Sequence, residues 1–416
     1  MGVYNIFGSI VFLVLGLIAF FCLLFSGGIT VSSMILSLNN WWLFDSLSFY
    51  LLCLVGLLGV YSVYSSNSYL SPQVKFYLSL SLIFSCACFC VNHAVLFWCF
   101  YELSMLPLLY LIFYDSPYSE RFIAGWYFLV YLTVTSLPLI LILLYLSSVY
   151  DSFTFDSWGQ NSVSLPVLLT LSFVFFTKVP LSPFHTWLPI VHAEATSIVS
   201  IFLSGYIMKL GLLGVYRCCC YVFNSETYVY LFFCCVFSLF FLVTASNELD
   251  GKRWLAFLSL SHIVVPFLSF YVASWESISL GFIFCLGHGL SAGLVFGILW
   301  LFYNSTNSRN WVLLKTGVSG TMIMLFFVIA MLSLCSFPPT MQFFSEVNLL
   351  KDSIISWLLL IFWVFYLFFG GLVPMVFCGH SLIRNEAVEA SGYSLSCFVF
   401  YFLYLALWCF LGVFLL

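Results

Sequence analysis

The sequence predicts an all-α polytopic membrane protein with about thirteen transmembrane helices. Of its 416 residues, 64% are hydrophobic and only 6% are charged, whereas about 25% of the residues in an ordinary soluble domain are charged. A chain this apolar must face lipid rather than water, which excludes the soluble globular and disordered classes. Because about 20 residues cross the hydrocarbon core, the length allows roughly 12 to 14 helices.

Polar residues, glycines and prolines divide the chain into thirteen apolar segments, each a candidate helix. The predicted segments are 3–25, 47–65, 75–92, 94–114, 122–149, 163–179, 196–222, 228–247, 253–273, 277–303, 320–350, 353–379 and 393–415. An odd number of crossings places the two ends of the chain on opposite sides of the membrane.

Basic residues in the predicted loops give the orientation, because Lys and Arg favour the inner side. Loops after even-numbered segments hold Lys75, Arg121, Lys252, Arg253, Arg309, Lys315 and Arg384, whereas the other side holds only Lys351 and Arg217. This asymmetry predicts an inner N-terminus and an outer C-terminus. The first segment lacks the basic residues that begin a secretory signal, so we expect it to be retained as a span.

Two segments contain prolines where a continuous helix is expected. One break is at Lys178-Val-Pro-Leu-Ser-Pro183, and the other is at Phe337-Pro-Pro-Thr340. Proline removes an amide donor, and freed backbone groups at membrane depth are tolerated only inside protein or beside a wet cavity. Broken helices mark ion paths in transporters, although a simple kink is the alternative.

The two breaks suggest a division of the chain. Residues 94–222 and 223–379 each combine continuous helices with one broken segment, a pattern consistent with an inverted repeat. The remaining parts are predicted to be N-terminal helices in 1–93 and a C-terminal helix in 380–416.

A few ionisable residues lie inside the apolar segments and are the candidates for function. Because such a group costs at least ~2.5 to 3.5 kcal/mol at the bilayer centre, it faces protein or water and indicates transport by default. The main candidates are Glu102, Lys178, Lys209, His262, His288 and Glu346; His185, His192 and Glu194 near the first break are secondary candidates.

Each candidate also has a purely structural interpretation. Glu102 and Glu346 can form structural pairs, Lys178 at a helix end can extend to the interface, and an intramembrane His is often only a helix contact. The residues near the first break can satisfy freed backbone groups. Lys209 is too deep to reach the interface. A line of Glu, Lys and His is nonetheless how pumps relay protons, because each charge alters its neighbour's proton affinity.

Several classes of chemistry find no support in the sequence. The 16 Cys lie mostly in apolar runs without paired Cys-x-x-Cys spacing, and we interpret them as small hydrophobic residues. There is no phosphate-binding, dinucleotide-binding, haem or iron-sulfur motif, so no cofactor or metal is predicted in this chain. The net charge of −4 has no basic stripe that would bind nucleic acid.

Six motifs carry a resemblance to a known family. They are Phe100-Tyr-Glu102-Leu-Ser-Met-Leu-Pro107, Lys178-Val-Pro-Leu-Ser-Pro-Phe-His185-Thr-Trp-Leu-Pro189 continuing through His192-Ala-Glu194-Ala, Met208-Lys209-Leu-Gly211, Ser259-Leu-Ser-His262, Gly287-His288-Gly-Leu and Pro338-Pro-Thr-Met-Gln-Phe-Phe-Ser-Glu346. In these motifs the sequence resembles the antiporter-like membrane subunits of respiratory complex I, and most closely their chain 4 branch.

The resemblance implies roles for the candidate residues. Glu102 is similar to the family's carboxylate that pairs with the broken-helix lysine, here Lys178. Lys209 is similar to the lysine of the central axis, His262 and His288 to bridging residues, and Glu346 to the terminal residue, which is typically Lys in the related chains 2 and 5. The family usually has fourteen helices with this Glu on the fifth, whereas Glu102 is on the fourth predicted segment here.

The implied function is proton translocation through this Glu/Lys/His relay, driven by electron transfer in other subunits of NADH:ubiquinone oxidoreductase. NADH, FMN, iron-sulfur clusters and ubiquinone are then expected in the assembly and not in this chain, with chains 2 and 5 and membrane lipids as partners. The 50 Phe, 25 Tyr and 16 Cys are typical of a T-rich organelle genome, which favours the mitochondrial inner membrane with a matrix N-terminus. The alternatives are a free-standing cation/proton antiporter and a scaffold bundle.

Overall fold

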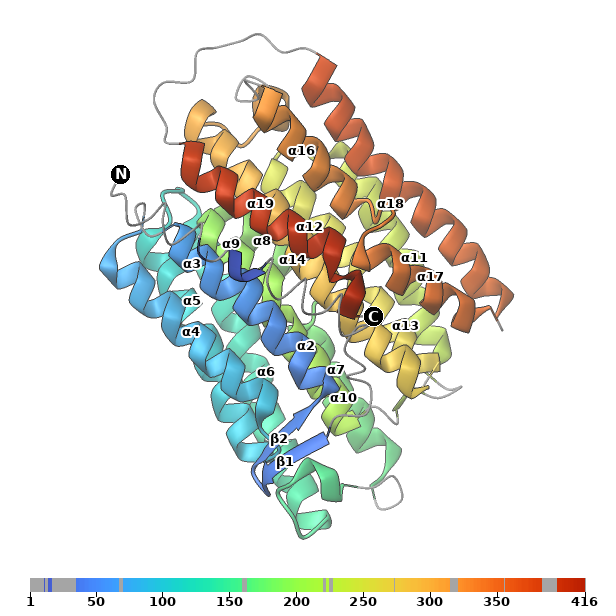
Figure 1. Cartoon of the computed structure of the whole chain (residues 1–416). Helices are drawn as coiled ribbons and strands as arrows, with labels where there is room; N and C mark the ends of the chain where they lie inside the picture. Colours follow the sequence, from blue (N-terminus) through green and yellow to red (C-terminus); the bar gives the residue numbers. More distant parts are fainter. Residues whose placement is uncertain are drawn as a thin grey trace.

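The computed structural model of the chain is a bundle of long α-helices (Figure 1). It describes residues 11, 14–16, 35–66, 70–158, 163–219, 222–223, 227–272, 274–314, 321–354, 356–383 and 395–415. Most of the predicted segment 3–25, and the loop residues Lys315 and Arg384, lie outside the described residues.

The first half of the bundle consists of one short sheet and the helices up to residue 219. Its elements are β1 (Ile35–Asn39), β2 (Trp42–Asp45), α2 (Ser46–Leu54), η2 (Val55–Val60), α3 (Tyr61–Ser65), α4 (Pro72–Cys90), α5 (Ala94–Asp115), α6 (Arg121–Val149), η3 (Phe155–Ser157), α7 (Leu165–Lys178), α8 (Trp187–Glu194), α9 (Ser197–Phe202), η4 (Leu203–Ile207) and α10 (Met208–Cys219).

The second half is entirely helical within the described residues. Its elements are α11 (Tyr228–Asn247), α12 (Gly251–His262), α13 (Val264–Val272), α14 (Trp275–Thr306), α15 (Trp311–Leu314), α16 (Thr321–Leu334), α17 (Met341–Ser353), α18 (Trp357–Ile383), α19 (Leu395–Leu411) and η7 (Gly412–Leu415).

Nine helices in the described part of the chain are long and apolar enough to cross a membrane, and three shorter apolar helices accompany them. From residue 46 onward, the observed boundaries agree with the predicted segments to within a few residues. The polar residues, glycines and prolines between apolar runs therefore located the helices, because each loop begins where an apolar run ends.

The two proline-containing breaks are present. α7 ends at Lys178 and α8 begins at Trp187, while α16 ends at Leu334 and α17 begins at Met341. The N-terminus of α17 is capped by Thr340, whose Oγ1 accepts a hydrogen bond from the amide of Phe343 at 3.4 Å. Each break is thus a stretch of irregular backbone between two short helices, and α8 after the first break lies outside the predicted segments.

A third interruption was not predicted. α12 ends at His262 and α13 begins at Val264. Ile263 between them is a turn residue that keeps helical dihedral angles and donates to the carbonyl of Ser259 at 3.1 Å. Pro266 has no amide hydrogen to donate to the carbonyl of His262 one turn earlier, which explains the break. The predicted segment 253–273 corresponds to one membrane-length span, Gly251–Val272, and the turn at Ile263 is a local interruption within it.

The predicted all-α fold also gains a short antiparallel hairpin of β1 and β2. The sequence analysis left this stretch between the predicted segments 3–25 and 47–65. Asp45 at its end caps α2 by accepting from the amide of Ser48 at 2.9 Å. The same carboxylate pairs with Arg217 of α10 at 3.2 Å, which fixes the hairpin to the bundle.

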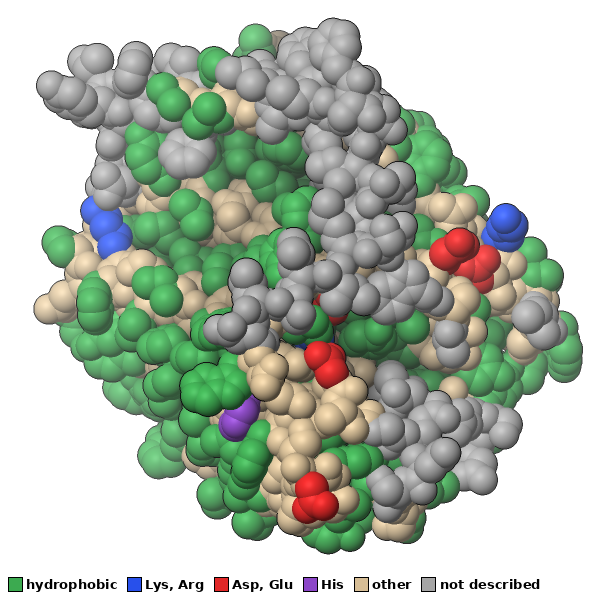
Figure 2. Space-filling view, turned by 60° about the horizontal axis from the view of Figure 1, so that its bottom comes forward, with side chains coloured by type: hydrophobic (Ala, Val, Ile, Leu, Met, Phe, Trp, Pro, Cys, Tyr) green, Lys and Arg blue, Asp and Glu red, His purple; other side chains and the backbone are tan. Residues whose placement is uncertain are grey.

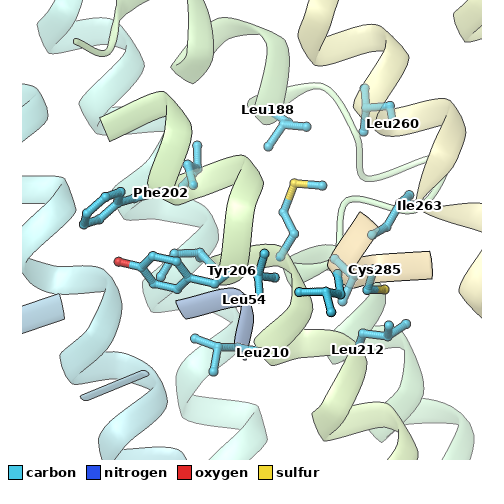
Figure 3. Packing of buried hydrophobic residues seen from close by; sticks show 14 of the residues in the cluster. Leu54, Leu188, Phe202, Tyr206, Leu210, Leu212, Leu260, Ile263 and Cys285 are labelled. Carbon is cyan, nitrogen blue, oxygen red and sulfur yellow. The ribbon is translucent and has the colours of Figure 1, made fainter. Parts of the chain in front are cut away.

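The centre of the bundle is α14, whose membrane-spanning window is fully buried, as is that of 197–219. Glycines allow this packing: a Cβ on Gly293 would lie 2.2 Å from Leu58 Cδ1, and one on Gly289 would lie 2.6 Å from Leu54 Cδ1. Side chains from α2, α8, α9, α10, α12 and α14 meet in one apolar cluster around this helix (Figure 3). The polar groups described next therefore lie in a medium of low polarity.

The periphery is apolar, as expected for a surface in lipid. α6 and α18 have less than half of their spans buried and expose large hydrophobic side chains such as Leu137, Leu141, Val364 and Phe368. Hydrophobic side chains also cover much of the face seen in Figure 2, where charged groups are few and scattered.

Candidate functional site

Glu102 on α5 and Lys178 at the end of α7 form an ion pair. Lys178 Nζ lies 2.7 Å from Glu102 Oε1, and the side chains are 2% and 16% exposed, respectively. The ammonium group also lies 4.4 Å from the centroid of the Tyr101 ring. Lys178 therefore does not extend to the interface, which was one structural alternative for a lysine at a helix end.

Lys209 occupies the middle of the bundle, at the start of α10. It is completely buried, and its Nζ donates to the carbonyl of Ser204 at 2.6 Å. Ser204 belongs to the π-helical turn η4, a wide turn that often occurs at functional sites. Among the described residues no carboxylate lies within ion-pair distance of Lys209, and its charge acts on His262, His288 and the thiol of Cys285.

His262 and His288 lie side by side beyond Lys209. Their ring centroids are 5.0 Å apart, with His262 at the end of α12 and His288 in the middle of α14. His262 Nδ1 shares a short hydrogen bond with the hydroxyl of Tyr366 on α18. Both nitrogens of His288 and Nε2 of His262 are buried without a hydrogen-bond partner in the part of the chain that is described.

Tyr366 connects the histidines to Glu346. Its hydroxyl donates to Glu346 Oε1 on α17 at 3.4 Å. Glu346 is 2% exposed, and the same oxygen accepts from Ser336 Oγ at 3.0 Å and Gln342 Nε2 at 3.4 Å. His262, Tyr366 and Glu346 thus form one hydrogen-bonded chain across α12, α18 and α17.

Sequence reasoning missed Tyr366, Gln342 and Ser336. Gln342 carries a usable signal, because it precedes Glu346 by one helical turn in an apolar stretch. Tyr366 carries none, since it is one of 25 tyrosines in a chain rich in aromatic residues.

The secondary candidates separate into two groups. His185 interacts with the backbone carbonyl of Pro183, and its ring centroid lies 4.5 Å from that of Phe241. The first contact agrees with a role in pairing backbone groups freed at the break. His192 is fully buried against Phe296, and neither ring nitrogen has a hydrogen-bond partner within the described ranges. The charges of Lys209 and Lys252 both act on His192.

Glu194 belongs to an ionic cluster at the side of the basic loops. Arg309 Nη1 lies 3.0 Å from Glu194 Oε1, and Arg309 Nε lies 3.4 Å from Asp250 Oδ2. Although burial opposes the charge of Arg309, the carboxylates of Asp250 and Glu194 outweigh it and raise the pKa of Arg309. These three residues and Arg253 line a polar cavity of about 250 Å³.

Lys252 requires a correction. The sequence analysis placed it in a loop, but it lies in the first turn of α12 and is only 3% exposed. Its Nζ donates to the carbonyl of Ala195 at 2.9 Å and to the hydroxyl of Tyr118 at 3.2 Å. The long side chain folds inward because the broken segment before α9 offers it a free carbonyl.

The structure therefore brings the candidates into two main groups. Lys209, His262, His288 and Glu346 are neighbours along one line, whereas Glu102 and Lys178 form a separate pair. No direct contact joins Lys178 to Lys209 among the residues described. Within the same residues no group of three or more His, Cys, Asp or Glu side chains is arranged to hold a metal ion.

Residues 91–373 match the profile of the NADH:quinone oxidoreductase/Mrp antiporter transmembrane family. The chain belongs to this family. The matched region contains both groups of ionisable residues, from Glu102 to Glu346.

Among curated proteins, the chain is similar to NADH-ubiquinone oxidoreductase chain 4 of two arthropods. It is 28% identical to that of Rhipicephalus sanguineus over 321 residues, covering 75% of this chain and 73% of the relative. It is 29% identical to that of Artemia franciscana over 280 residues, covering 67% of this chain and 71% of the relative.

Solved structures show the same fold. A chain of respiratory complex I from Thermus thermophilus with bound NADH superposes with a TM-score of 0.76 at 18% identity, covering 96% of this chain and 89% of that chain. A chain of the Mrp complex from Dietzia has a TM-score of 0.74 at 14% identity, covering 92% of this chain and 76% of that chain. The predicted antiporter-like membrane bundle is confirmed.

Proposed function

We propose that this chain is a proton-translocating, chain 4-type membrane subunit of respiratory complex I. The observation that carries the proposal is the buried hydrogen-bonded chain of His262, Tyr366 and Glu346, which joins three helices in an apolar core. The buried Lys209 acts on His262 through its charge. The names of the curated relatives and the family match support it.

Proton movement in this proposal follows the line of contacts. The hydroxyl of Tyr366 contacts His262 on one side and Glu346 on the other, so it can accept a proton from one neighbour while donating its own to the other. Lys209 acts on both histidines through its charge. A change of protonation at Lys209 therefore alters the proton affinity of the next group in the line.

The Glu102–Lys178 pair has a separate role in the proposal. While the pair is closed, the carboxylate balances the ammonium charge. When it opens, the uncompensated charge of Lys178 disfavours a further positive charge on Lys209 and drives its proton onward, because repulsion is weakly screened in an apolar interior.

The electron-transfer chemistry belongs to other subunits in this proposal. NADH, FMN, iron-sulfur clusters and ubiquinone are bound elsewhere in the assembly, and this chain contributes proton translocation to the enzyme as a core subunit without a redox site. Its neighbours are the antiporter-like chains 2 and 5, together with membrane lipids. The exposed apolar faces of α6 and α18 offer surfaces of the required kind.

The proposed location is the mitochondrial inner membrane. The excess of Lys and Arg in one set of loops supports an N-terminus on the matrix side and a C-terminus on the intermembrane side. Residues 94–222 and 223–379 remain the proposed antiporter-like halves, flanked by 1–93 and 380–416.

The substitution Lys209→Met tests the proposed function. It removes the charge at the centre of the line but keeps a flexible apolar side chain of similar length. We expect the complex to assemble and NADH-driven proton pumping into vesicles to be lost. Lys351→Met, which removes an exposed Lys from α17, is the matched control and should pump normally. Full pumping by Lys209→Met would overturn the proposal.

A free-standing cation/proton antiporter is the second candidate, because the family includes Mrp antiporters and an Mrp chain shares the fold. Isolation of the chain alone as an active exchanger in vesicles would favour it. Co-purification with NADH:ubiquinone oxidoreductase activity favours the complex I subunit. A scaffold without transport predicts lost assembly whenever a buried charge is removed.

A further inference from the structure

The residue before Glu102 contacts the same ammonium group. Tyr101 is fully buried on α5, and Lys178 Nζ lies 4.4 Å from the centroid of its ring. Lys178 is thus contacted by two consecutive residues: a carboxylate at 2.7 Å and an aromatic face. A desolvated ammonium group in this position is attracted by the negative face of the ring.

Packing alone holds the Tyr101 ring in place. Phe97 lies on the same helix with its ring centroid 6.0 Å away. The α10 backbone also borders the side chain, because a Cβ on Gly211 would lie in ordinary van der Waals contact with the Tyr101 hydroxyl, at 3.5 Å. That hydroxyl has no hydrogen-bond partner among the described residues. The ring face, rather than the hydroxyl, therefore makes the specific contact of this side chain.

The two partners of Lys178 differ in how they respond to a proton. Glu102 is the more open of the pair, with 16% of its side chain exposed against 2% for Lys178. A proton that binds Glu102 cancels the carboxylate charge and with it most of the attraction. The attraction of the Tyr101 ring does not depend on the protonation state of Glu102, so it persists when the ion pair is lost.

We infer that Tyr101 is a positioning residue for Lys178: its ring face holds the ammonium group, charged and inside the protein, while Glu102 is protonated. The inference rests on the proposed function, since it concerns one step of proton translocation. The groups that face Lys178 are Glu102 and Tyr101 from α5 and the thiol of Cys88 from α4. Cys88 is therefore included in the test.

The test compares Tyr101→Leu with Tyr101→Phe in the assembled complex, using NADH-driven pumping into vesicles across a series of pH values. Tyr101→Phe keeps the ring face and should retain most of the pumping. Tyr101→Leu removes it, and we expect a loss of about tenfold on the alkaline side that shrinks as the pH falls, because acid restores the ammonium form. Tyr101→Met repeats the test with a more adaptable side chain if Tyr101→Leu assembles poorly.

Two controls separate positioning from packing. Phe327→Leu removes a buried ring that packs on Phe302 and Phe377 rather than on Tyr101. Cys88→Ala removes the thiol. Both should leave the alkaline limb of the pH profile in place. The inference is overturned if Tyr101→Leu and Tyr101→Met follow the pH profile of Tyr101→Phe, or if their loss of pumping is the same at every pH. It is also overturned if Cys88→Ala shifts the alkaline limb of the profile. Pumping by Lys209→Met would instead refute the underlying proposed function.

Discussion

At the scale of single residues, the hydroxyl of Tyr366 joins groups from two other helices. It contacts His262 Nδ1 on α12 and Glu346 Oε1 on α17, and the whole side chain is 1% exposed. A phenol hydroxyl both donates and accepts, so it can link two groups that do not touch each other. Loss of this one oxygen would interrupt the line without opening the core.

Tyr366→Phe tests this link. The substitution keeps the ring and its packing but leaves His262 and Glu346 without a shared partner, which costs about 1 to 3 kcal/mol. We expect normal assembly and a fall of about tenfold in the rate of proton pumping. Tyr401→Phe is the matched control, because it removes a buried hydroxyl that donates to the carbonyl of Gly293 away from the line. Equal pumping by the two variants would argue against the link.

The candidate site was only partly readable from the sequence. Charged residues in an apolar chain are conspicuous, so Glu102, Lys178, Lys209 and Glu346 could be selected from sequence alone. Tyr366 could not be, because an uncharged residue type that is common throughout the chain acquires meaning only from its neighbours. Lys252 was assigned to a loop because it lies at a predicted helix boundary. Its burial depends on the tertiary fold, which the sequence alone does not reveal.

At the scale of elements, close approach of helices sets the geometry around α14. Leu58 from η2 fills the space beside Gly293 of α14 and Gly205 of η4, where added Cβ atoms would lie 2.2 and 2.5 Å from its methyl carbons. The three elements therefore meet around one leucine. His288 lies on α14, and Lys209 lies on α10, which follows η4 directly.

Gly293→Ala should destabilise the assembled protein by about 1 to 3 kcal/mol, because the new methyl group overlaps Leu58. Thermal inactivation of the purified complex measures the effect. Adding Leu58→Ala should restore part of the loss by making room for the methyl group. Gly371→Ala on α18 is the control, since nothing lies within 4 Å of its added Cβ. A Gly293→Ala protein as stable as this control would contradict the packing argument.

The elements themselves could mostly be predicted, because the helices begin and end where apolar runs begin and end. The adjacent prolines at 338 and 339 made the second break plain. The break at Ile263 was hidden, since a single proline such as Pro266 is also compatible with a continuous kinked helix, as Pro107 is in α5. The π-helical turns η2 and η4 have no recognisable sequence signal.

At the scale of the whole molecule, Arg309 ties distant parts of the chain together at the side of the basic loops. Its guanidinium bonds Glu194 and the carbonyl of Ala193 on α8, and it pairs with Asp250 before α12. Its own carbonyl accepts from the amide of Gly251 at 3.0 Å. One side chain thus connects the proposed first half of the bundle to the second.

Arg309→Met should loosen this connection. Because the side chain is 30% exposed, the loss of stability is expected to be modest, about 1 kcal/mol. The local effect should be clearer: faster amide hydrogen exchange at 193–195 and 250–252 in the assembled complex. Arg253→Met removes a charge from the same cavity, but Arg253 has no ion pair among the described residues. Identical exchange in the two variants would dismiss the connection.

The turn at Ile263 places His262 at the end of a helix rather than in its interior. Because Pro266 has no amide hydrogen, it cannot donate to the carbonyl of His262, as the fourth residue along a regular helix would. The backbone of His262 thus lacks one of the hydrogen bonds that hold a residue inside a helix. The imidazole that contacts Tyr366 and lies beside His288 is carried by this less constrained position.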